Sequence, residues 1–140
     1  MKEETIRKKL NKAGLKATPA RLAILALFAK RHTPLSADDI AIALKKEKID
    51  LVTIYRTFAS LEKAFILKRV DLRRDAAYFE MADNHHHHHL VCTECGDIED
   101  FELCDIGNLS QKILKKSSKF KAVSDHAFEL FGLCTSCAGK

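Results

Sequence analysis

The sequence carries five consecutive histidines in its interior, and a pair of cysteines follows them at once. The run HHHHHLVCTEC extends from His85 to Cys95, far from either end of the 140-residue chain. Imidazole nitrogens and thiolates are the ligands that Zn²⁺ and related metals bind most readily in proteins. This spacing therefore predicts metal chemistry in the segment.

A second Cys-x-x-Cys pair lies near the C-terminus, with 38 residues between the two pairs. We expect a structural Zn²⁺ in tetrahedral coordination by four thiolates, from Cys92, Cys95, Cys134 and Cys137. Residues 85–140 are too few to bury much core, so such a metal would decide whether they fold. Disulfides or a redox Cys-x-x-Cys are the alternatives, and Cys104 is interpreted as an apolar packing residue.

The histidine run is interpreted as part of an extended strand, whose successive side chains point to opposite faces. His85, His87 and His89 would then face one way, and His86 and His88 the other. The strand would carry two half-sites back to back, each of which needs further ligands. A histidine run alone is more often an incidental metal-binding patch, but the adjoining cysteine pair favours a specific site. The candidates for the further ligands are Glu80, Asp100, His126 and His32.

Positive charge is concentrated in the first half of the chain. Residues 1–75 hold 18 Lys and Arg against nine Asp and Glu, whereas residues 76–140 hold six against ten. This split favours a nucleic-acid-binding half followed by an acidic, ligand-rich half, with solvated helix faces as the alternative. No apolar run reaches the roughly 20 residues of a membrane span, and no signal peptide is evident. We therefore expect a cytoplasmic protein with no membrane partner.

Four helical segments are predicted before residue 66. The first runs from about Thr5 to Ala13, and the second starts at Pro19 after the N-cap Thr18. The third follows a capping box of Ser36 and Asp39. The fourth, DLVTIYRTFASLEKAF, places apolar residues at steps of three and four. These residues, which we expect to face the core, are Leu51, Ile54, Phe58, Leu61 and Phe65.

The opposite face of the fourth helix is the candidate DNA-reading surface. Arginine can read guanine edges in the major groove, and hydroxyls and lysine can bind phosphates. An ordinary amphipathic surface helix is the alternative. The residues assigned to this face are Thr53, Arg56, Thr57, Ser60 and Lys63, with Tyr55 at its boundary.

Two strand-like runs, ILKRVDL and AAYFEMA, follow the helices and are separated by a charged turn at Arg73 and Arg74. Helices followed by a hairpin are the element order of a winged helix-turn-helix, with the hairpin tip near the DNA backbone. We therefore predict an α+β fold. Residues 1–82 would form a winged-helix DNA-binding domain, and residues 83–140 a small α/β dimerisation domain with a four-cysteine zinc site.

The sequence resembles the ferric uptake regulator (Fur) family of bacterial metal-responsive repressors over about residues 10–137. The resemblance implies a winged helix, a dimerisation domain and a homodimer that binds operator DNA when metal is bound. The stretches that carry it are GLKATPARLAIL, LSADDI, VTIYRTFASLEKAFIL, FEMADNHHHHHLVCTECG and DHAFELFGLCTSC.

The resemblance also implies roles for individual residues. The four cysteines already named would be the ligands of the structural zinc. Tyr55 and Arg56 match the base-contacting part of the recognition helix, and Lys16 matches a residue that approaches the minor groove. The regulatory metal site would use Glu80, His87 and His89, and a second metal site would use His86, His88, Asp100 and His126.

Three departures from the family pattern bear on the metals. Pro34 stands where the family often has a regulatory-site histidine, which leaves His32 as the candidate replacement. The second site is nitrogen-rich, because His88 stands at a frequent Asp position and Gly107 at a frequent Glu position. This composition makes the second site less suited to Fe²⁺. Zinc-sensing members often have a cysteine shortly before the histidine run, and Ala77 to Asn84 contains none. For this reason the regulatory metal is expected to be Fe²⁺ or Mn²⁺ rather than Zn²⁺.

The sequence as a whole predicts a metal-dependent transcriptional repressor that controls metal-homeostasis or oxidative-stress genes, with double-stranded operator DNA as its partner. An enzyme is not expected, and neither is a small-molecule substrate, because four thiolates close the coordination of a zinc ion. The alternatives are a zinc-dependent enzyme domain or a metal-buffering protein without sequence-specific DNA binding.

Overall fold

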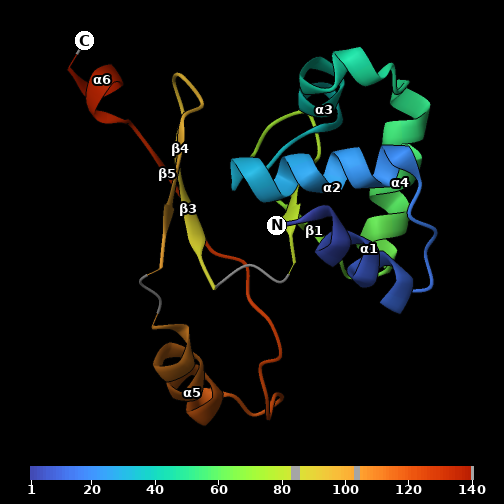
Figure 1. Cartoon of the computed structure of the whole chain (residues 1–140). Coiled ribbons are helices and arrows are strands. Elements are labelled where there is room, and N and C mark those ends of the chain that lie inside the picture. Colours follow the sequence, from blue (N-terminus) through green and yellow to red (C-terminus); the bar gives the residue numbers. More distant parts are fainter. Residues whose placement is uncertain (83–85, 103–104, 140) are drawn as a thin grey trace. The chain divides into compact units, whose positions relative to one another are not determined.

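The computed structural model describes residues 1–82, 86–102 and 105–139 and divides into two compact units, Met1–Asn84 and His85–Lys140 (Figure 1). His85 and Cys104 lie outside the described residues. The predicted α+β class is confirmed, and none of the helices in the described ranges is long and apolar enough to cross a membrane. The elements are α1 (Glu3–Lys12), α2 (Pro19–Arg31), α3 (Ala37–Ala43), η1 (Lys45–Glu47), α4 (Leu51–Lys63), β1 (Leu67–Val70), β2 (Tyr78–Met81), β3 (His88–Cys92), β4 (Ile98–Phe101), α5 (Ile106–Lys116), β5 (Glu129–Gly132) and α6 (Thr135–Ala138).

The helix starts of the first unit follow the predicted capping residues. The Thr18 hydroxyl accepts from the Arg21 backbone N–H, and Pro19 occupies the first turn of α2. In α3, the Ser36 hydroxyl accepts from the Asp39 N–H at 3.2 Å, and the Asp39 carboxylate accepts from the Ser36 N–H at 2.9 Å. These bonds satisfy backbone donors that a helix N-terminus otherwise leaves unpaired, and so they fix where each helix begins.

An aromatic cluster joins α2, α4 and β2 in the core of the first unit. The ring of Phe58 on α4 lies 5.9 Å from that of Phe28 and 4.7 Å from that of Phe79, centroid to centroid. Ile54 and Leu61, one turn to either side on α4, are completely buried. This packing orients α4 so that its opposite face is left to solvent.

The predicted faces of α4 need correction at three residues. Leu51 is 44% exposed and Phe65 is 86% exposed, although both were expected to face the core. The helix ends at Lys63, and Phe65 adopts a left-handed conformation that takes its side chain out of the helical stripe. Thr57 is buried, not exposed as predicted, because it lies three residues after Ile54 and therefore on the same face.

The hairpin after α4 completes the predicted winged helix. Strands β1 and β2 pair antiparallel, and the segment before α3 joins them through backbone bonds between Leu35 and Phe79. At the hairpin tip Arg73 has a positive φ, and the Asp71 carboxylate accepts from its N–H at 2.9 Å. The tip therefore carries the two exposed arginines on a turn whose shape is fixed by a side-chain hydrogen bond.

The second unit is a three-stranded sheet in the order β4-β3-β5, with helices α5 and α6 (Figure 1). Strand β3 pairs antiparallel with β4 and parallel with β5. Among the described residues of this unit, the only buried hydrophobic side chains are Val91 and Cys92. A sheet with so small a core needs another source of stability.

Candidate metal centres and candidate DNA-reading helix

Four cysteines come together at one end of the sheet. Their sulfur atoms all lie within 4.8 Å of one another. The residues are Cys92, Cys95, Cys134 and Cys137. The Sγ atoms of Cys95 and Cys134 are 3.7 Å apart, and the described cysteines are free of disulfides. Zn–S bonds of about 2.3 Å at the tetrahedral angle place sulfurs about 3.8 Å apart. The four thiols therefore fit a tetrahedral Zn²⁺.

The local backbone prepares this group to bind a cation. The Cys134 N–H donates to Cys92 Sγ at 3.4 Å, and this bond is the largest cause that lowers the pKa of Cys92 to about 6. Hydrogen bonding to Cys134 and desolvation instead raise the pKa of Cys137 to about 12. Protons and a metal thus compete for the same sulfurs, and a divalent cation supplies the charge that keeps all four as thiolates.

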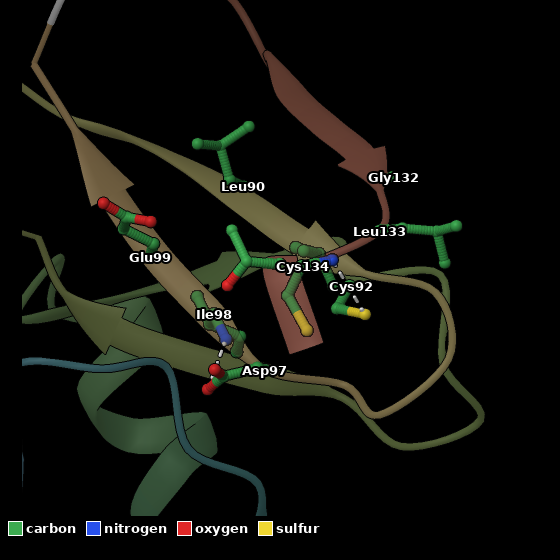
Figure 2. Close-up of a pocket in the computed structure, with 10 residues that line it drawn as sticks. Leu90, Cys92, Asp97, Ile98, Glu99, Gly132, Leu133 and Cys134 are labelled. Carbon is green, nitrogen blue, oxygen red and sulfur yellow. Dashed lines mark hydrogen bonds between the residues drawn. The ribbon is translucent and has the colours of Figure 1, made fainter. Parts of the chain in front are cut away.

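An open pocket of about 300 Å³ lies beside the cysteine cluster, between the segments of β3, β4 and β5 (Figure 2). Figure 2 shows the Cys134 N–H directed at the Cys92 sulfur. Cys92 is the last residue of β3, and Cys134 directly precedes α6. Leu90 and Leu133, which also line the pocket, are 41% and 55% exposed. The cysteine cluster is therefore bordered by a pocket that two exposed leucines line together with polar side chains.

Three histidines form a second cluster within the same unit. Ring nitrogens of His86, His88 and His126 lie within 4.8 Å of one another, and the Nε2 atoms of His88 and His126 are 3.4 Å apart. Two imidazoles on one tetrahedral Zn²⁺ would be separated by about 3.3 Å. Among the described residues, no carboxylate joins this group. The three side chains can therefore hold a cation through nitrogen alone.

The His88 ring is prepared to act as a neutral ligand. It is 4% exposed and packs against Phe101 and Phe128, at centroid distances of 5.5 and 5.2 Å. Burial lowers the pKa of His88, and the neighbouring His86 and His126 lower it further. A neutral imidazole has the lone pair that a metal needs.

His87 and His89 lie on the other face of the strand, with ring centroids 5.0 Å apart. The predicted alternation is thus confirmed for the four described histidines of the run. Asp100 stands opposite His89 on β4, and its Oδ1 lies 3.6 Å from His89 Nε2. The structure therefore places Asp100 beside His89 and not in the three-histidine cluster to which the sequence assigned it.

Glu80 and His32 belong to the first unit. The Glu80 carboxylate lies on β2, 3.3 Å from the Lys68 ammonium on β1. His32 is exposed at the left-handed C-cap of α2. No group of three or more potential metal ligands among residues 1–82 includes His32. Its proposed role as a ligand receives no support from the fold of this unit.

The candidate DNA-reading face of α4 begins at a capped N-terminus. The Asp50 carboxylate accepts from the Thr53 N–H at 2.7 Å, and this bond is the first cause of a lowered Asp50 pKa. The cap therefore contributes stability above the ordinary carboxyl pKa, and it is lost as pH falls through the lowered value. Tyr55 is 57% exposed, Arg56 is exposed and Thr53 is half-buried. Three of the predicted contact residues on α4 are thus available in its first two turns.

Lys16 lies in the loop between α1 and α2. Its side chain is exposed, and its carbonyl oxygen accepts from the Arg21 guanidinium at 2.9 Å. The same oxygen accepts from the Thr18 N–H at 3.0 Å. These two bonds hold the backbone of the loop that carries the Lys16 ammonium.

Glu129 is a site residue that sequence reasoning missed. One of its carboxylate oxygens lies 2.8 Å from both the backbone N and the ring Nδ1 of His89. The signal was available in the stretch DHAFELFG, where Glu129 follows His126 by three residues. Only the parallel register of β5 against β3 shows that it stands beside His89.

Comparison with known proteins decides the family. The sequence profile described as the Ferric uptake regulator family matches residues 12–131. The chain belongs to this family. Fur-family proteins are transcriptional regulators and not enzymes, so the chain is a metal-responsive transcription regulator, and a zinc-dependent enzyme is excluded.

Relatives cover nearly the whole chain. The Ferric uptake regulation protein of Bordetella parapertussis is 39% identical over 133 residues, which are 91% of this chain and 93% of the relative. The Vibrio cholerae ferric uptake regulator structure aligns with a TM-score of 0.79 at 30% identity, over 91% of this chain and 98% of that one. The Helicobacter pylori regulator, described as having three functional metal binding sites, aligns with a TM-score of 0.78 at 27% identity, over 99% and 95%.

Proposed function

We propose that this Fur-family protein is a cytoplasmic, homodimeric repressor that binds operator DNA when a regulatory divalent metal is bound. The observation that carries the proposal is the pair of histidine clusters on opposite faces of one strand, beside a four-cysteine site. A structural zinc held by the four cysteines does not account for the five further imidazoles, which belong to His86, His87, His88, His89 and His126. The first unit supplies the element that would bind DNA, a capped helix with exposed Tyr55 and Arg56.

Three metal sites follow from these ligand groups. The four cysteines would hold structural Zn²⁺, and His86, His88 and His126 would hold a second metal ion. Glu80, His87 and His89 would form the regulatory site, and Asp100 would be a further ligand beside His89. The mixed nitrogen and oxygen donors of this site suit Fe²⁺ or Mn²⁺. The binding of a cation by these ligands would select the conformation of the protein that fits an operator.

The homodimer is supported by helix α5. Its apolar residues Ile106, Leu109 and Ile113 recur at steps of three and four, yet no residue of α5 is buried. Leu109 and Ile113 are 52% and 56% exposed. An amphipathic helix that buries no side chain within its own chain needs a second surface, and a second copy of the chain supplies one. We therefore propose that α5 packs in the dimer interface.

The direct test of the proposed function is metal-dependent DNA binding. Duplexes that bind the Mn²⁺-loaded protein are first enriched from a random pool, and the best duplex is then compared with a scrambled one. We expect Mn²⁺ to raise affinity for the enriched duplex by about 5–150-fold, the usual range of coupling between two ligands. Equal affinity with and without Mn²⁺ or Fe²⁺ would contradict the repressor proposal.

Arg56 and Lys63 share α4 but should differ in how they contribute to DNA binding. Arg56→Ala should relax sequence preference, because a bidentate guanine contact discriminates by about 1–3 kcal/mol. Lys63, two turns later on the helix, is expected to contact a phosphate. Lys63→Ala should therefore weaken binding to all duplexes alike and flatten the salt slope by about one unit. A salt series on enriched and scrambled duplexes distinguishes the two effects, and an unchanged preference in Arg56→Ala would exclude base reading by this side chain.

The three-histidine cluster should prefer a different metal from the regulatory site. Imidazoles favour Zn²⁺ and Co²⁺ over Mn²⁺, whereas carboxylates favour Mn²⁺. In a His87→Ala background, Co²⁺ should therefore bind this cluster with tetrahedral visible absorption and should resist displacement by excess Mn²⁺. Adding His88→Asp should make Mn²⁺ a better competitor. Equal competition in both proteins would show that His88 does not set the preference.

A further inference from the structure

The carboxylate of Glu129 lies beside the ring of His89 in a geometry that fixes that ring. Strands β3 and β5 run parallel, and His89 and Glu129 are partners in their register. Oε2 of Glu129 lies 2.8 Å from the His89 backbone N–H nitrogen and 2.8 Å from ring Nδ1. The side chains are 1% and 17% exposed, so water competes little for these bonds. A single oxygen thus binds both the backbone and the ring of one histidine.

This contact determines which ring nitrogen can bind a cation. A carboxylate oxygen accepts hydrogen bonds, so a neutral His89 must carry its proton on Nδ1, and its lone pair is on Nε2. Nε2 is the ring atom 3.6 Å from Asp100 Oδ1. Ligand bonds of about 2.1 Å at the tetrahedral angle would separate two donor atoms by about 3.4 Å. Nε2 and Oδ1 are therefore placed as two ligands of one cation would be.

We propose that Glu129 is a positioning residue of the regulatory site. It holds the Nδ1–H tautomer of His89, directs Nε2 toward the cation that Asp100 shares, and increases the basicity of the ring through its own charge. Carboxylates that accept from a ligand histidine have this effect at metal sites in general. The inference rests on the proposed function, since it requires His89 to be a metal ligand.

The position of Glu129 also ties this site to the cysteine cluster. Strand β5 ends at Gly132, two residues before Cys134, and the Gly132 carbonyl accepts from the Thr93 N–H at 2.8 Å. The register that sets Glu129 beside His89 is therefore continuous with the segment that carries two zinc ligands. The ring of His89 is held by the same strand that the structural zinc would anchor.

The test uses Glu129→Gln, which keeps the size of the side chain and a carbonyl acceptor but removes the negative charge. Protein with its structural zinc and without regulatory metal is titrated with Mn²⁺, and long-range ¹H–¹⁵N spectra report the His89 tautomer. We expect wild-type His89 to be protonated on Nδ1. In Glu129→Gln this preference should weaken, and Mn²⁺ affinity should fall by about 10–100-fold. Glu99→Gln, the same change at an exposed position on β4, is the matched control and should leave both readouts unchanged.

Each outcome bears on the proposal. An Nε2–H tautomer in the wild type overturns it without any variant, and so does wild-type Mn²⁺ affinity in Glu129→Gln with normal zinc content. His89→Ala separates this inference from the proposed function. If His89→Ala binds Mn²⁺ as the wild type does, the regulatory site itself is wrongly assigned. If His89→Ala loses Mn²⁺ while Glu129→Gln keeps it, the proposed site stands and only the role of Glu129 is refuted.

Discussion

A Cys92→Ser variant is expected to lose its structural zinc and, with it, the fold of the second unit. A serine hydroxyl is a poor zinc ligand, so three thiolates would remain to hold the cation. The zinc content measured after purification should fall from about one ion per chain toward zero. Far-ultraviolet circular dichroism and size-exclusion chromatography should report the loss of the sheet and of the proposed dimer together.

The physical reason is the small core of this unit. In its described part, Val91 and Cys92 are the only hydrophobic side chains that are buried, whereas the first unit buries a continuous cluster from Ile6 to Met81. Metal binding contributes about 10–16 kcal/mol of apparent free energy to the folding of zinc-finger peptides. A contribution of that size exceeds what so few apolar contacts can supply. The first unit should therefore unfold as a separate transition in the variant.

Cys104→Ser is the matched control, because the same exchange is made at the one cysteine outside the proposed ligand set. It should keep its zinc and its dimer. A Cys92→Ser protein that retained one zinc per chain and a wild-type melting temperature would show that the four cysteines do not hold a structural metal.

The elements of the first unit were predictable because local chemistry determines them. Thr18 and the pair Ser36 and Asp39 mark helix starts by hydrogen bonds that are encoded within four residues. The limits of α4 were less predictable. Phe65 continues the apolar period, yet the chain leaves the helix at Lys63, and periodicity alone does not mark a left-handed residue.

The metal ligands were likewise predictable only where a single segment of the chain determines them. Alternation along a strand separated His86 and His88 from His87 and His89, because the period of two is a property of one segment. The partners from other strands could not be derived in this way. Asp100 and Glu129 reach His89 only through the register of β4 and β5 against β3, and register depends on how three distant segments pack. Sequence reasoning therefore named the right strand, missed Glu129, and assigned Asp100 to the histidines of the opposite face.

His87→Ala and His89→Ala are expected to abolish the stimulation of DNA binding by metal while leaving the structural zinc in place. Both histidines lie on the face of β3 that the proposed regulatory site uses, and neither is a member of the cysteine or the three-histidine cluster. A ligand shifts a conformational equilibrium only through its difference in affinity for the two states. Without these imidazoles Mn²⁺ would bind the two conformational states with nearly equal affinity, and the expected 5–150-fold stimulation would disappear.

His86→Ala is the control that makes this test specific, because His86 belongs to the same histidine run but to the opposite face. Fluorescence anisotropy with the enriched duplex, at fixed salt and rising Mn²⁺, should give a stimulated curve for His86→Ala and flat curves for His87→Ala and His89→Ala. The reverse pattern would assign sensing to the three-histidine cluster. Flat curves for all three variants would show that both faces of β3 contribute to a single response, and stimulation in all three would place the sensor outside the histidine run.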